Sequence, residues 1–200
     1  MKYLVLIAAS AAFAGNTPVN PGPVDDDGVW LKYHNGTPVW CTWDGVYRGV
    51  WFDVWDFYPG ATVNFLEQTA FWFFHEVSHP WDTSDAYVEI WNGDAVGPVV
   101  MLDQTMVTAV HYAPVFAAYH PDINVEANFW ALVNTEMSAG GWPSVAGDGG
   151  QSGSAHSFFS QDFINWQPWN PNGICNYFMA ADWFGWSLEG TTWGSIKSSF

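Results

Sequence analysis

Lysine and arginine are nearly absent from this sequence. The 200 residues contain 4 Lys plus Arg against 20 Asp plus Glu, which gives a formal net charge of −16 at pH 7. No basic residue of either type occurs between Arg48 and Lys197. Because Lys and Arg are needed to neutralise phosphates, this composition argues against nucleic acid and anionic lipid as partners. Strong acidity instead favours solubility and attracts cations.

Cysteine and long apolar runs are also scarce. The apolar run at residues 4–9 is too short to cross a bilayer, and no later segment has the required length and apolar character. The two cysteines are Cys41 and Cys175. In an exported protein, two cysteines predict one disulfide, which would close a loop of about 134 residues and contribute about 4 kcal/mol. Two buried free thiols are the alternative.

The first fourteen residues have the pattern of an export signal. Lys2 gives the positive charge, residues 4–9 the apolar core, and Ala12-Phe13-Ala14 the small-x-small cleavage site. We expect bacterial-type export to the medium or the cell surface. The expected organisation is a signal peptide at 1–14, an extended leader at 15–28, a β-sandwich domain at 29–185 and a C-terminal tail at 186–200.

The leader ends in three consecutive carboxylates, Asp25, Asp26 and Asp27, followed by Gly28. Carboxylate oxygens are the ligands that Ca²⁺ prefers. The spacing differs from the D-x-[DN]-x-[DN]-G pattern of calcium loops. The expectation is therefore no cofactor, with Ca²⁺ on these aspartates as an alternative.

Aromatic residues are abundant, whereas Leu and Ile are few. The chain has 15 Trp, 15 Phe and 8 Tyr, so the core must be built from rings, Val and Ala, which suits sheets. Short strands recur between Gly, Pro and Asn turn signals, and Val50, Phe52 and Val54 alternate with Trp51, Asp53 and Trp55. This pattern predicts an all-β fold, a single antiparallel β-sandwich, jelly-roll-like, with a long Gly/Ser loop at 137–154.

Some of these tryptophans are expected at the surface, because one domain of this size can hardly bury all of them. Trp142 lies in the Gly/Ser loop, and Trp166 and Trp169 lie in the later stretch 163–169. We take these three as candidates for stacking on sugar rings, because exposed aromatic patches mark binding sites. Packing in the core is the alternative for each.

The motif HEVSH at residues 75–79 matches the zinc-hydrolase pattern H-E-x-x-H. In that chemistry His75 and His79 share one helix face and bind Zn²⁺, while Glu76 acts as general base. Pro80 disfavours a helical conformation at His79, and the aromatic run at 71–74 favours a strand. In a strand the two histidines would lie about 13 Å apart, too far for one metal ion. A zinc site therefore stays an alternative, with Asp82, Asp85 and Glu89 as candidates for the third ligand.

Three segments resemble a known family: PWDTSDAYVEIWNGD at 80–94, GPVVMLDQT at 97–105 and NFWALVNTEMSAGGWPSVAGD at 128–148. Together with DDDG at 25–28, they are similar to secreted bacterial cell-surface jelly-roll domains, a β-sandwich family of unassigned function. The resemblance covers most of the mature chain, and its motifs are structural. It implies a sandwich used for adhesion, carbohydrate contact or assembly, with no catalytic residues to carry over.

We therefore expect a secreted, non-enzymatic β-sandwich for extracellular binding or assembly, such as adhesion or a subunit of a surface filament. The expected partner is either another copy of the chain, joined through edge strands and the leader, or an extracellular polysaccharide. A carbohydrate-binding module that uses exposed tryptophans is one alternative function. A zinc metallohydrolase that uses His75, Glu76 and His79 is the other.

Overall fold

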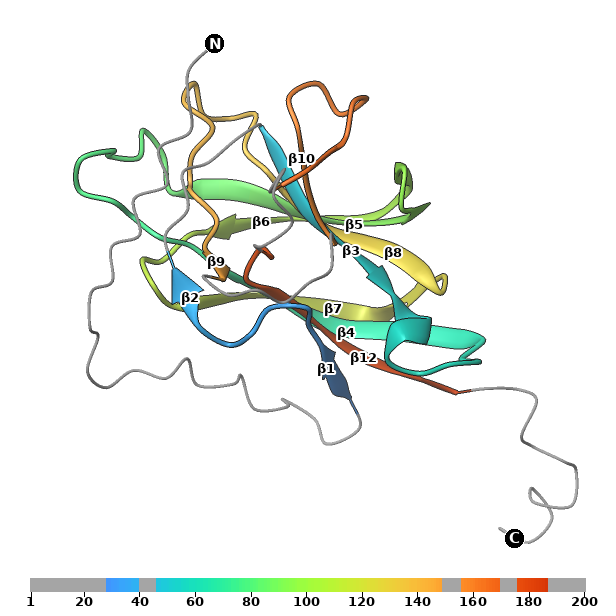
Figure 1. Cartoon of the computed structure of the whole chain (residues 1–200). Helices are drawn as coiled ribbons and strands as arrows, with labels where there is room; N and C mark the ends of the chain where they lie inside the picture. The colour runs from blue at the N-terminus through green and yellow to red at the C-terminus, as the bar shows by residue number, and fades with distance from the viewer. Residues whose placement is uncertain (1–27, 40–45, 149–155, 170–175, 187–200) are drawn as a thin grey trace, which may run out of the picture.

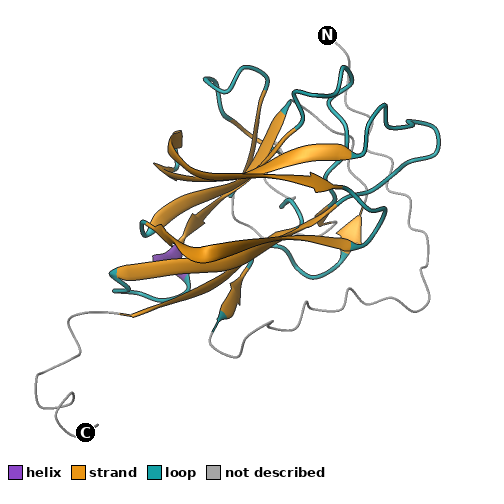
Figure 2. Ribbon diagram, turned by 180° about the vertical axis from the view of Figure 1, so that it is seen from behind, coloured by secondary structure: helices purple, strands orange, loops and turns teal. Residues whose placement is uncertain are grey.

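The computed structural model describes residues 28–39, 46–148, 156–169 and 176–186. Its regular secondary structure is almost entirely antiparallel strands, most of which form two facing sheets, as Figures 1 and 2 show. The all-β sandwich expected from the sequence is confirmed. The export signal, Asp25, Asp26, Asp27, Cys41, Cys175 and the tail from residue 187 lie outside the described residues.

The larger sheet has six strands in the order β11-β10-β3-β8-β5-β6. Their bounds are Tyr47–Asp53 for β3, Asp85–Asp94 for β5, Gly97–Thr108 for β6, Asn128–Asn134 for β8, Ser157–Ser160 for β10 and Gln167–Pro168 for β11. The strand expected at residues 128–134 is thus β8, which lies between β3 and β5. The long strands β5 and β6 form a hairpin, so β6 is one edge of this sheet.

The smaller sheet has four strands in the order β1-β12-β4-β7. Their bounds are Val29–Leu31 for β1, Val63–Trp72 for β4, Pro114–Val125 for β7 and Met179–Trp186 for β12. A separate pair joins β2 (Pro38–Val39) to β9 (Gly147–Asp148), and a 3-10 turn, η1, covers Val54–Asp56. Within the described residues, no helix has the length and apolar character needed to span a membrane.

The main core lies between the two sheets and follows the predicted alternation along β3. Val50 and Phe52 are buried in this core, whereas Trp51 points to the outer face of the six-stranded sheet. Phe52 stacks on Phe129 of β8, with ring centroids 5.0 Å apart. Burial of alternate residues therefore fixes which face of β3 meets the smaller sheet.

Aromatic residues also pack on the outer face of the six-stranded sheet. The cluster contains buried Trp130, Leu132 and Phe158 and partly buried Trp51, Trp91, Phe163 and Trp166. The segment 161–166 covers this face, and Trp166 lies 5.1 Å from Trp130 between ring centroids. This outer layer explains how a single domain buries so many rings without placing all of them between the sheets.

Two strand boundaries differ from the sequence prediction. A strand was expected at 71–78, but β4 ends at Trp72. Its pairing with β12 stops where Met179 faces Phe71, and its pairing with β7 stops where Pro114 faces Trp72. A turn was expected at residues 92–94, but these residues belong to β5, and the hairpin loop is residues 95–96. Gly93 approaches the backbone of β6 so closely that a Cβ atom there would clash with the Gly97 carbonyl oxygen.

The described part of the Gly/Ser loop packs against the protein rather than extending into solvent. Residues 141–148 are all buried. The fully buried Arg48 donates from Nη2 to the Gly141 carbonyl (2.6 Å), and Ser138 Oγ donates to Asp82 Oδ1 (2.6 Å). The hydrogen bond from Ser138 holds the pKa of Asp82 below its usual value. These contacts fix the loop on the sandwich, contrary to the expected exposed position of Trp142.

Candidate functional site

The HEVSH motif lies in a loop that follows β4, and its backbone is not helical. His79 N donates to the Glu76 carbonyl (2.9 Å), which closes a turn, and Ser78 Oγ donates to Glu76 Oε1 (3.2 Å). The His75 ring packs against Trp81, with centroids 4.8 Å apart. Two histidines in this turn do not share a helix face, which is the arrangement that a zincin site requires. The strand proposed for these residues is also wrong, since β4 ends before them.

The three carboxylates considered as a third zinc ligand are engaged elsewhere. Asp82 binds Ser138 and the Ala139 backbone, and Asp85 accepts from Thr108 Oγ1 at 2.7 Å. Glu89 is buried in the six-stranded sheet. Across the part of the chain that the structure describes, no three His, Cys, Asp or Glu side chains come together as a metal site would need.

The tryptophans proposed as sugar-stacking residues differ in exposure. Trp142 and Trp169 are buried, because the loop packs inward and because Trp169 stacks on Tyr177 with ring centroids 5.0 Å apart. Trp166 is partly buried, and its Nε1 donates to the Phe163 carbonyl (3.1 Å). Among the tryptophans of residues 28–39, 46–148, 156–169 and 176–185, only Trp55 falls in the exposed class, at 53% exposure. The sequence pattern placed Trp55 on a strand face and gave no sign of this exposure.

Exposed apolar side chains concentrate on the edge strand β6. Thirteen large hydrophobic residues are exposed in the described chain, and five of them lie within residues 96–106. They are Val96 (81%), Val99 (71%), Val100 (54%), Met101 (49%) and Met106 (62%). We call these five residues the β6 patch. Asp103 is the one charged residue of β6, and its carboxylate accepts a hydrogen bond from Thr105 Oγ1 (3.0 Å).

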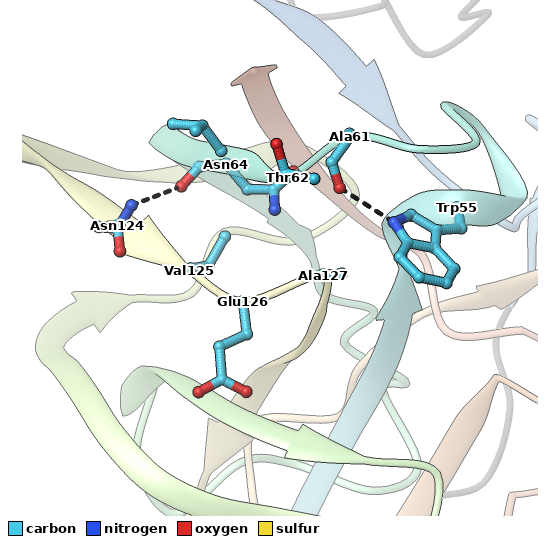
Figure 3. Close-up of a pocket in the computed structure, with 9 residues that line it drawn as sticks. Trp55, Ala61, Thr62, Asn64, Asn124, Val125, Glu126 and Ala127 are labelled. Carbon is cyan, nitrogen blue, oxygen red and sulfur yellow. Dashed lines mark hydrogen bonds between the residues drawn. The ribbon is translucent and has the colours of Figure 1, made fainter. Parts of the chain in front are cut away.

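A small pocket lies beside Trp55 at the end of the sandwich, where η1 and the start of β4 meet the connection from β7 to β8 (Figure 3). Its volume is about 390 Å³, and its lining comes from residues 55, 61–64 and 124–127. Trp55 Nε1 donates to the Ala61 carbonyl (3.0 Å), and Asn124 Nδ2 donates to the Asn64 carbonyl (3.2 Å). The first bond fixes the Trp55 indole at the rim of the pocket, and the second fixes the Asn124 side chain there.

Comparison with protein-family models, with curated proteins and with solved structures finds no match for this chain.

A stack of rings anchors η1 and thereby Trp55. The His156 ring lies between Tyr33 (centroids 3.6 Å apart) and Trp51 (4.9 Å apart). Tyr33 Oη donates to Asp56 Oδ2 (2.7 Å), and His156 Nε2 lies 3.4 Å from the same oxygen. Burial raises the pKa of Tyr33 and lowers the pKa of His156, although the hydrogen bond to the Trp51 carbonyl and the Asp56 carboxylate oppose the second shift. At neutral pH both rings are therefore uncharged, and their stacking positions η1.

Proposed function

We propose that this protein is an exported, non-enzymatic β-sandwich that assembles with further copies of itself by pairing β6 strands edge to edge. The observation that carries the proposal is the β6 patch: four of its five residues lie on β6, an edge strand of twelve residues with one hydrogen-bonded neighbour, and Val96 lies in the hairpin loop just before it. An edge strand has a row of backbone N–H and C=O groups that can pair with another extended chain.

The other edges of the four-stranded and six-stranded sheets carry the features that prevent edge pairing. At the far side of the larger sheet, β11 has two residues, and β1 of the smaller sheet has three. The fourth edge, β7, is long but contains Pro121 and Asp122 in its middle. Short strands, prolines and charges all block edge-to-edge association. By contrast, β6 has its proline near one end, at Pro98, and pairs regularly with β5 from Asp103 to Thr108.

Charge favours a second copy of the same strand as the occupant. The chain carries a formal net charge of −16, so most surfaces of two copies repel each other. With a single aspartate in twelve residues, β6 brings few carboxylates into contact. Two β6 strands paired antiparallel around a two-fold axis form a self-complementary interface, and they join two six-stranded sheets into one. Such pairing also brings the apolar side chains of the two β6 strands into cross-strand contact, which covers part of the β6 patch.

The test is the size of the purified protein by sedimentation velocity across a concentration series. Wild type is expected to form dimers or larger species as concentration rises, and Val100→Glu with Met106→Glu is expected to stay monomeric. The matched control is Val29→Glu with Val77→Glu, which adds the same charge at two exposed apolar positions away from β6. Wild type that stays monomeric, or a control that dissociates as fully as the β6 variant, would contradict the proposal.

A further inference from the structure

The pocket beside Trp55 has the features of a binding site that is separate from the β6 patch. Two parts of the chain that are distant in sequence form it: residues 55–64, from η1 to the start of β4, and residues 124–127, at the end of β7 and just after it. Its volume of about 390 Å³ lies near the lower end of the range found for small-ligand pockets, about 300–1,000 Å³.

Trp55 presents a large ring to solvent in a fixed orientation. Its Nε1 donates to the Ala61 carbonyl (3.0 Å), and its backbone N–H donates to Asp53 Oδ1 (2.9 Å), which caps η1. The half-exposed ring is therefore already immobilised before any ligand arrives. Binding on a preorganised ring avoids most of the entropy cost of ordering a side chain. The polar edge of the indole is occupied by Ala61, so the part left for contact is the apolar face.

The polar groups around the pocket select the chemistry of the ligand. Asn124 uses its Nδ2 group to bind the Asn64 carbonyl, and Figure 3 shows its side-chain oxygen turned away from that bond. Glu126 adds an exposed carboxylate at the rim. No Lys, Arg or His is among the lining residues. Hydrogen-bond acceptors without a cation favour a ligand that offers hydroxyl donors and carries no negative charge.

We infer that this pocket binds a neutral saccharide, with one sugar ring stacked on Trp55 and its hydroxyl groups donating to Asn124 and Glu126. A pyranose ring offers an apolar face of C–H groups to the indole and hydroxyls at its edge, which matches a site with an aromatic face and acceptors. The inference is independent of β6 pairing, because none of the lining residues belongs to β6.

The test uses saturation-transfer NMR and calorimetry with four neutral probes: maltohexaose, cellohexaose, xylohexaose and chitohexaose. We expect saturation transfer to the ring protons of at least one probe, with binding weakened at least tenfold in Trp55→Ala and several-fold in Asn124→Ala. Trp55→Phe keeps an aromatic face and is expected to retain part of the binding, which separates loss of stacking from misfolding.

The matched control is Ile164→Ala, an exposed apolar position at 81% exposure outside the pocket lining, which is expected to bind like wild type. Absence of binding for all four probes at millimolar concentration would overturn the inference, as would binding that is unchanged in Trp55→Ala. Both results leave the sedimentation test of β6 pairing unaffected, so failures of the two proposals are distinguishable.

Discussion

The imidazole of His34 lies face to face with the ring of Phe178, with centroids 3.7 Å apart and planes inclined by 23°. Its Nδ1 accepts a hydrogen bond from the Gly36 backbone N–H (3.2 Å). Burial, with a smaller contribution from Lys32, lowers the pKa of His34 to about 3. The folded protein therefore holds this ring neutral far below the pH at which an exposed histidine takes up a proton.

His34 is expected to cause a loss of stability in acid. Because its folded pKa is depressed below the ordinary value of about 6.5, the unfolded chain binds more protons, and stability falls as pH decreases below about 6.5. Between pH 7 and pH 5 the expected contribution is about 2 kcal/mol. His34→Phe keeps the stack on Phe178 and should remove this slope.

The measurement is urea unfolding at pH 7, 6 and 5 for wild type and His34→Phe. The variant loses the Gly36 hydrogen bond, so its stability at pH 7 is expected to fall by about 1 kcal/mol. The informative quantity is the difference in free energy of unfolding between the two proteins at each pH. A difference that stays constant from pH 7 to pH 5 would show that His34 does not titrate as the structure implies.

Asp182 is expected to act in the opposite direction. Its carboxylate is buried on β12 and accepts from Gln68 Nε2 (2.9 Å) through Oδ2. Burial raises its pKa above the ordinary value. With a raised folded pKa the folded state binds more protons, so stability falls as pH rises through that pKa. Asp182→Asn should remove this loss, and the variant should gain stability relative to wild type between pH 4 and pH 7 by thermal unfolding. Parallel curves for the two proteins would refute the assignment.

Glu89 is expected to stabilise the six-stranded sheet. It is buried and accepts hydrogen bonds at 2.8 Å from Trp91 Nε1, Gln104 Nε2 and Asn134 Nδ2. Glu89→Leu leaves three donors without this acceptor, and the expected cost is at least about 3 kcal/mol in chemical denaturation. The exposed Glu126→Leu is the control, with an expected change within about 0.5 kcal/mol. Equal effects of the two substitutions would contradict a structural role for Glu89.

The fold could be predicted from local patterns, because the alternation of Val50 and Phe52 with Trp51 depends on neighbours along one strand. Burial of the outer face could not be predicted in this way. Alternation identifies the two faces of a strand, but Trp130 and Trp166 show that a distant segment decides whether the outer face is covered. The exposure of Trp55 was also missed. Alternation places Trp55 on a strand face, but the strand ends at Asp53, whose side chain caps η1.

The β4 boundary shows a similar limit. The aromatic run at 71–74 was read as part of a strand, yet the ladder stops where β12 and β7 supply no further partners. Strand length is set by pairing with segments more than forty positions away, which propensity does not report. The HEVSH motif lies after the end of β4, and its backbone forms a turn, although its residue pattern matches that of a zinc-binding helix.

Edge pairing through β6 is tested most directly by amide hydrogen exchange at dilute and concentrated protein. Exchange reports protection residue by residue, so it separates β6 pairing from association elsewhere. We expect the amides of Asp103–Thr108 that point away from β5 to gain protection as concentration rises, whereas the amides of β7 and β11 should not change. Unchanged exchange along β6 over the same concentration range, with or without larger particles in the sample, would contradict it.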